Sequence, residues 1–258
     1  MDISKVTLIY FSPNGEVARI GRIASSQFRV PVEEVDITGQ SMPRPREFGI
    51  RDLVIVASPC HGGRVPEPVA RRLTQLMGRG TPAIPIIVFA GRTHDDSLRE
   101  LGDILTGNGC VPIAAAAISC EFPLDEHVGD IQLSEHECAE LRTFAIKARV
   151  KLGALQYAEA GRVTLEKNQP YRRALPTHLK PVSGDGCTSC GLCARMCPAG
   201  AIDHANPAHT DATKCISCMR CVKNCPQHAR TIPGFMRKME IIKSKCLRSI
   251  RDSNCFLL

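Results

Sequence analysis

The chain has 258 residues, of which 43% are hydrophobic and 23% charged, and these proportions exclude a largely disordered protein. Its longest purely apolar runs, residues 86–90 and 113–118, are far shorter than the roughly 20 residues that a membrane-spanning helix needs. The first ten residues lack the layout of a secretion signal, so we expect a cytoplasmic protein without a membrane span.

The first 155 residues alternate strand patterns with helix patterns. Apolar runs rich in β-branched residues predict five strands, at 6–11, 30–37, 53–57, 84–90 and 111–119. Apolar residues at helical spacing predict helices at 15–26, 68–77, 95–105 and 134–155. This alternation predicts an α/β domain over 1–155, with a doubly wound five-stranded parallel sheet in the order 2-1-3-4-5. The ligand site of such a sheet lies beyond the carboxyl ends of strands 1, 3 and 4.

The remaining residues fall into three predicted parts. Residues 156–183 combine scattered charges with three prolines and no periodicity, which indicates a linker. Residues 184–233 form a cysteine-rich module, for which we expect a small α+β domain. Residues 234–258 are predicted to form a basic, partly amphipathic helix with a short frayed end, and its apolar face is expected to pack on the protein. That face carries Phe235, Met239, Ile242, Cys246 and Ile250.

Eight of the 14 cysteines repeat one spacing twice. Each run reads C-x2-C-x2-C-x3-C-P, which is the bacterial spacing for [4Fe–4S] clusters. Three closely spaced cysteines wrap one cluster, and the fourth reaches the other cluster. The first predicted ligand set is therefore Cys187, Cys190, Cys193 and Cys225. The second is Cys215, Cys218, Cys221 and Cys197.

Zinc is the alternative metal, because zinc sites also use C-x2-C pairs. Zinc sites rarely use three such cysteines followed by a fourth and a proline, so we predict two iron–sulfur clusters. Over about 50 residues the module resembles the two-cluster ferredoxins of bacteria, with all eight ligands and both prolines in place.

The loop after the first predicted strand enters a helix and carries the first candidate contacts of an organic cofactor. It resembles the phosphate loop of flavodoxins, in which hydroxyls and backbone N–H groups at a helix N-terminus bind the phosphate of FMN. A valine replaces the last threonine of that pattern, so one hydroxyl is absent. The candidate residues are Ser12, Asn14, Gly15, Glu16 and Val17.

Two further loops follow the third and fourth predicted strands. Together with the cysteine module, they make the chain resemble the flavodoxin–ferredoxin fusion proteins of anaerobic prokaryotes. The resemblance implies an FMN-binding, flavodoxin-like domain followed by a ferredoxin with two clusters. Its further candidate FMN contacts are Pro59, Cys60, His61, Gly62, Gly63, Ala90, Gly91, Arg92 and His94.

Three of these loop residues depart from the family pattern. His61 and His94 stand where the family carries aromatic residues near the flavin ring, and a protonated imidazole there stabilises an anionic reduced flavin. Cys60 stands where valine is usual. We interpret it as a small buried residue rather than a reactive thiol, which needs an electropositive setting.

The net charge of +7 lies entirely in the last third of the chain. Residues 180–258 hold 12 Lys and Arg against 5 Asp and Glu. A basic surplus can mark a nucleic-acid surface, but bound thiolates would offset much of it, and we expect no nucleic-acid partner. The basic tail is either a solvated helix face or a docking surface for an acidic redox protein. Its cations are Arg237, Lys238, Lys243, Lys245, Arg248 and Arg251.

Three functions follow from these interpretations. The leading one is an electron-transfer protein that passes electrons between FMN and two clusters, to or from partner redox proteins. The second is a flavin-dependent reductase in which Cys60, His61 and His94 supply protons to a small molecule. The third is an iron–sulfur module whose flavodoxin fold holds no flavin. No catalytic triad or G-x-G-x-x-G fingerprint is present, and the sequence leaves a homodimer open.

Overall fold

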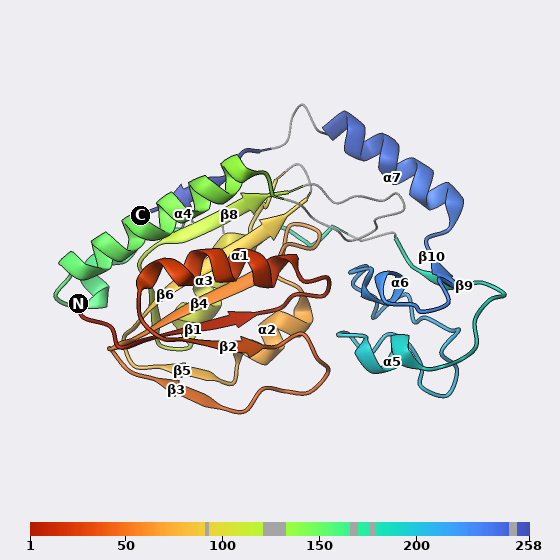
Figure 1. The fold of residues 1–258 in the computed structure, drawn as a ribbon, viewed down its shortest axis with the longest axis horizontal. Coiled ribbons are helices and arrows are strands. Elements are labelled where there is room, and N and C mark those ends of the chain that lie inside the picture. Colours follow the sequence, from red (N-terminus) through yellow and green to blue (C-terminus); the bar gives the residue numbers. More distant parts are fainter. Residues whose placement is uncertain (91–92, 121–132, 166–169, 176–178, 248–251) are drawn as a thin grey trace.

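The computed structural model describes residues 1–90, 93–120, 133–165, 170–175, 179–247 and 252–258. Its first part is built on a parallel sheet whose main strands follow the order β2-β1-β4-β6-β8 (Figure 1). Numbered as main strands alone, this order is the expected 2-1-3-4-5 of a flavodoxin-like sheet. The strands are β1 (Lys5–Tyr10), β2 (Val32–Asp36), β4 (Asp52–Pro59), β6 (Thr81–Phe89) and β8 (Ala115–Ser119).

Helices cover both faces of this sheet, and each face has its own core. Alternate residues of β1 point to opposite sides, with Leu8 in the core beneath α1 and α4 and Ile9 in the core beneath α2 and α3. Every residue of β6 is buried, as expected for a central strand covered on both faces. The helices are α1 (Glu16–Ser25), α2 (Glu67–Leu73), α3 (Ser97–Gly107) and α4 (Glu135–Ala154), with short 3₁₀ turns at η1 (Ser26–Phe28) and η2 (Ala158–Gly161).

Two predicted boundaries were wrong. The predicted helix 68–77 ends at Leu73, because the residues that follow form β5 (Leu76–Gly78) and pair with β3 (Arg46–Phe48). The predicted strand 111–119 is two strands, β7 (Cys110–Pro112) and β8, which pair with β6 at different points. Pro112 ends β7 because it has no N–H to donate to a strand ladder.

The C-terminal residues also differ from the predicted frayed end. The strand β11 (Cys255–Leu257) pairs antiparallel with β8 and forms an edge of the sheet, although the two strands are far apart in sequence. The ring of Phe256 stacks on Phe144 of α4, with 5.1 Å between centroids, and Asn254 accepts a hydrogen bond from the Ser119 N–H. Strand pairing and aromatic packing therefore hold this segment on the first part of the chain.

The tail helix α7 (Gly234–Leu247) does not bury its predicted apolar face. Phe235, Met239 and Ile242 are 78%, 54% and 58% exposed, whereas Met236, one residue further round, packs against Met219 and Ile232. The helix is thus rotated away from the orientation that its apolar spacing predicted. The side chains of Cys246, Lys243 and Lys245, and all of Ile250, Arg248 and Arg251, lie outside the described part of the chain.

The cysteine module lies beyond the carboxyl ends of the strands, next to α2 and the first turn of α1 (Figure 1). It has a small core that includes Ala194, Ala201 and Ile202. Its elements are β9 (Val182–Ser183), α5 (Leu192–Met196), α6 (Arg220–Lys223) and β10 (Arg230–Thr231), with β9 and β10 antiparallel. Of the helices that the structure describes, none combines the length and apolarity of a membrane span.

Candidate redox sites

Four cysteines from both runs line one cavity in the module. They are Cys187, Cys190 and Cys193 of the first run together with Cys225 of the second. These four are the first predicted ligand set. Gly191, at a φ of 71°, starts α5 and permits the tight loop between the cysteines. Cys190 is exposed, so this cavity lies close to the surface of the module.

A second cavity is lined by the other four cysteines. Cys215, Cys218 and Cys221 come from the second run, and Cys197 reaches the cavity from the first run, at the end of α5. Within the described residues, no three His, Cys, Asp or Glu side chains come together closely enough to share a single metal ion. Each set of four thiols surrounds a space instead, and this donor set fits a cubane-type cluster.

Burial raises the pKa of these thiols, whereas hydrogen bonds from backbone N–H groups lower it. Burial raises the pKa of Cys218 to about 12 and that of Cys221 to about 11, so neither is a thiolate by itself at neutral pH. For Cys225, burial raises the pKa, but backbone N–H groups at Arg230, Gln227 and Ala229 outweigh it and the net pKa is lowered. Bound iron keeps such ligands deprotonated, and N–H donors stabilise their charge.

The predicted phosphate loop leads into α1 as a phosphate site requires. Gly15 caps the helix at a φ of 100°, and no side chain hydrogen-bonds the first N–H groups from that position. Glu16 and Val17 form the first helical residues, so their N–H groups can receive an anion. The Ser12 hydroxyl accepts a hydrogen bond from the Ala18 N–H at 3.1 Å. The loop thus fits a phosphate held by backbone donors.

The loop after β4 is a tight turn. Pro59 ends the strand, the Cys60 N–H donates to the Val88 carbonyl at 2.7 Å, and His61 pairs with Arg64 across Gly62 and Gly63. Both glycines have positive φ, 59° and 82°. Burial raises the pKa of the Cys60 thiol, so Cys60 stays protonated at neutral pH. This agrees with its interpretation as a small packed residue.

The two histidines, His61 and His94, lie in different loops, after β4 and after β6. Burial, and then the charge of Lys180, lower the pKa of His61 to about 4. His61 is therefore neutral at pH 7, and the protonated imidazole considered from the sequence is not expected there. His94 packs edge-on against Phe89, with 5.6 Å between ring centroids. Ala90 follows β6 and is exposed, and Gly91 and Arg92 lie outside the described residues.

The phosphate loop touches the second cysteine run directly. The Asn14 amide donates to the backbone carbonyl of Cys218 at 2.8 Å, and Lys223 donates to the Asn14 carbonyl at 3.0 Å. Sequence reasoning placed Asn14 at a phosphate. Its side chain instead bridges from the loop to the backbone of a predicted cluster ligand.

A buried cation forms a second junction between the two parts. Arg72 of α2 has no exposed surface, and its guanidinium donates to the carbonyls of Ile37 at 3.1 Å and Pro198 at 2.6 Å. Pro198 follows Cys197, which lines the second cavity. Nearby, Gln40 donates to the Ala194 carbonyl at 2.8 Å. Nothing in the sequence indicates this role, because Arg72 occupies an ordinary position in an amphipathic helix.

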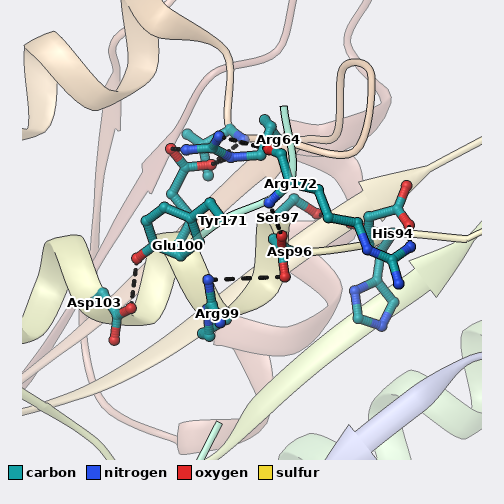
Figure 2. A network of polar contacts seen from close by, with 11 residues as sticks. Arg64, His94, Asp96, Ser97, Arg99, Glu100, Asp103, Tyr171 and Arg172 are labelled. Atoms are coloured by element: carbon teal, nitrogen blue, oxygen red, sulfur yellow. Dashed lines mark hydrogen bonds and ion pairs between the residues drawn. The ribbon is translucent and has the colours of Figure 1, made fainter. Parts of the chain in front are cut away.

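Residues 170–175 of the expected linker are anchored on the first part of the chain. Figure 2 shows the Tyr171 ring between the guanidinium groups of Arg64 and Arg99, which lie 4.6 Å and 4.1 Å from the ring centroid. The Tyr171 hydroxyl donates to Asp103 at 2.5 Å, and Arg64 pairs with Glu100 at 2.7 Å. An aromatic residue held on both faces by cations fixes the position of this segment.

The same segment reaches the loops of the candidate flavin site. The Arg172 N–H donates to Asp96 at 2.6 Å (Figure 2), and the Leu175 N–H donates to the Gly62 carbonyl at 2.8 Å. A Cβ atom added at Gly62 would lie 2.2 Å from the Leu175 carbonyl oxygen, so the two backbones are in close contact. The single sequence signal for this anchor is Tyr171, one of only three tyrosines in the chain.

Comparison with known proteins gives one family match and several structural neighbours. Residues 186–247 match the family model described as a 4Fe-4S dicluster domain. The search of curated proteins gives no match.

The structural neighbours are flavodoxins that align with the first part of the chain. A flavodoxin from the domain Archaea is 10% identical over 58% of this chain and 99% of its own, with a TM-score of 0.42. A flavodoxin of Streptococcus pneumonia TIGR4 is 15% identical over 57% of this chain and 99% of its own, with a TM-score of 0.39. A short-chain flavodoxin associated with a PDU bacterial microcompartment is 15% identical over 59% of this chain and 100% of its own, with a TM-score of 0.40.

From its own strand order and the family match, the chain combines a flavodoxin-like sheet with a C-terminal module similar to 4Fe-4S dicluster domains.

Proposed function

We propose that this chain is an electron-transfer protein that holds two [4Fe–4S] clusters and FMN close together and exchanges electrons with partner redox proteins. The observation that carries the proposal is the contact between Asn14 of the phosphate loop and the carbonyl of Cys218. It brings a candidate flavin loop and a candidate cluster loop within hydrogen-bond distance. When bound, FMN supplies two-electron capacity and the clusters supply one-electron transfer.

The residues of the chain have separate roles in this proposal. The crossed sets of four cysteines hold the clusters. The N–H groups at the start of α1 hold the phosphate, and the loops at Pro59–Gly63 and Ala90–His94 contact the flavin ring. Arg72 and Gln40 fix the cysteine module against the sheet, and Tyr171 fixes the linker on it. Fixed separation matters because electron transfer needs the centres to stay close.

We expect the ligand released on denaturation to be FMN and not FAD or a nicotinamide, because the phosphate loop offers the N–H groups of one helix end and no glycine-rich pyrophosphate turn. Mass spectrometry of the supernatant tests this. Gly15→Asp is expected to reduce flavin binding at least about tenfold, since a carboxylate there repels the phosphate.

Gly15→Asn is the matched control for that variant. Asn and Asp tolerate positive φ about equally, so both variants place the same demand on the backbone. The Asn variant is expected to retain flavin, and both are expected to retain iron. Equal flavin loss in the two variants would attribute the effect to the backbone, and release of FAD would contradict the assignment of the loop.

A second candidate function is an iron–sulfur carrier whose flavodoxin-like domain holds no flavin. The observation that favours it is the seating of Leu175 on Gly62, which puts the chain's own backbone against a candidate flavin loop. Anaerobic preparation, followed by incubation with FMN and assay of iron, acid-labile sulfide and flavin, separates the two functions. Full iron content with no flavin after incubation supports the second.

We further propose that the partner is an acidic redox protein that docks on α7. Arg237 and Lys238 are exposed on this helix beside the exposed Phe235, and the surplus positive charge lies in this part of the chain. Electron transfer to an acidic ferredoxin, used as the acceptor, is expected to slow about tenfold as ionic strength rises from low salt to 0.5 M. Stopped-flow spectroscopy measures this rate.

Charge reversal locates the docking surface. Arg237→Glu with Lys238→Glu is expected to slow the transfer without loss of iron or flavin. Arg51→Glu reverses an exposed cation just before β4, at the amino ends of the strands and away from the cysteine module, and is expected to leave the rate unchanged. A rate that responds neither to salt nor to the α7 variant would leave this helix with a structural role only.

A further inference from the structure

The two cysteine runs can be aligned for four residues beyond their prolines, and the last aligned position is buried in both. The first run continues Cys197-Pro-Ala-Gly-Ala-Ile202, and the second continues Cys225-Pro-Gln-His-Ala-Arg230. Ile202 is an apolar core residue, 3% exposed. Arg230 stands in the equivalent position and is buried to the same degree, 2% exposed. A cation thus replaces an aliphatic side chain in the interior of the module.

The Arg230 guanidinium lies against a cysteine of the first ligand set and acts electrostatically on a cysteine of the second. It lines the first cavity, where one of its nitrogens lies 3.9 Å from the sulfur of Cys193. Its charge also lowers the pKa of Cys221, whose thiol lines the second cavity, against the larger effect of burial. The placement follows the duplication, because Arg230 lines the first cavity and its equivalent Ile202 lines the second.

Among the described residues, the oxygen acceptors of Arg230 are all neutral. Its nitrogens donate to the carbonyls of Pro207 at 2.8 Å and Pro181 at 3.3 Å, and to the hydroxyls of Ser183 and Thr210. A buried cation is costly unless an anion compensates it. A cluster held by four thiolates is such an anion, and it gains a further negative charge on reduction.

We propose that Arg230 is a positioning residue that raises the reduction potentials of both clusters by placing one buried positive charge and its N–H donors between them. This inference rests on the proposed binding of two clusters. The charge favours the reduced form of each cluster, because reduction adds negative charge near the guanidinium. The low dielectric of the buried site makes the effect larger than that of a surface cation.

Redox titration of the full chain, followed by EPR, tests the proposal. Arg230→Ile copies the residue that the first run carries at this position. It is expected to keep its iron and to make each cluster about tenfold harder to reduce, which corresponds to about 59 mV for a one-electron couple. Arg230→Lys keeps the charge and is expected to retain most of the wild-type potential. Arg195→Gln, which removes an exposed cation bonded to the Cys190 carbonyl, is the surface control and should leave both potentials in place.

The readouts separate this inference from the proposed function. Iron and sulfide in the wild-type chain are measured first, and a chain that cannot be loaded with clusters overturns both. If Arg230→Ile does not retain iron, Arg230→Gln replaces it, since a shorter amide keeps hydrogen-bond donors and removes the charge. Charge-neutral variants that unfold more easily but keep both wild-type potentials would make Arg230 a structural residue and overturn the proposal.

Discussion

Replacing Cys197 and Cys215 together is expected to remove one cluster completely and leave the other intact, with about four irons per chain in place of about eight. Cys197 belongs to the first run by sequence, but it lines the same cavity as Cys215, Cys218 and Cys221. The double variant takes two ligands from that set and none from the other. Iron and sulfide assays, with the EPR spectrum of the reduced protein, measure the outcome.

A second pair makes the test independent of how well a cluster survives on three ligands. Cys197→Ala with Cys187→Ala removes one ligand from each crossed set, so both clusters are expected to be damaged. If the ligands were not crossed, this pair would spare one cluster and the first pair would damage both. Cys138→Ala is the control, because this buried thiol of α4 belongs to the sheet core, and about eight irons should remain.

Removing the guanidinium of Arg72 is expected to weaken the junction between the sheet and the module. In Arg72→Met the carbonyls of Ile37 and Pro198 lose their donor while the apolar stem is retained. The unpaired buried carbonyls should cost about 2–3 kcal/mol, which lowers the melting temperature by roughly 5–10 °C in a chain of this size. Pro198 follows Cys197, so the second cluster is expected to lose iron faster to a chelator.

Arg71→Met is the matched control for this prediction. Arg71 is the preceding residue of α2, is exposed, and pairs with Glu67 at 3.2 Å. An exposed pair contributes little, so this variant should change stability by less than about 0.5 kcal/mol and leave iron release unchanged. Equal effects of the two variants would attribute the loss to helix α2 rather than to the buried junction.

The fold of the first part could be predicted because its pattern is local and repeated. The buried strands are continuous apolar runs, and the helices between them carry apolar residues on one face. At α4 the local signal was complete: the Ser134 hydroxyl accepts the Glu137 N–H, and the Glu137 side chain returns to the Ser134 N–H. The boundaries at Leu73 and Pro112 were missed because pairing with distant strands decided them.

The candidate cluster ligands could be predicted because the spacing of the cysteines alone indicates the type of cluster that they bind. Cubane geometry dictates three cysteines on one loop and a fourth that points away. The predicted flavin loops rest on fewer residues, and part of that site, Gly91 and Arg92, lies outside the described chain. His61 shows the limit of the sequence, because burial and Lys180 determine its neutral state and neither is visible in the loop motif.

The sequence by itself therefore determined the order of the main strands, the position of the candidate phosphate loop and the grouping of the cysteines, since each follows from short-range pattern or fixed ligand geometry. Only the tertiary structure decided where the non-periodic segments go. Tyr171 lies between two arginines that are distant in sequence. Phe256 stacks on Phe144 of α4, and its strand β11 extends the sheet at β8. The exposed Phe235 and the buried Arg230 reverse what their residue types predict, because long-range packing, and not local hydrophobicity, sets which side chains water reaches.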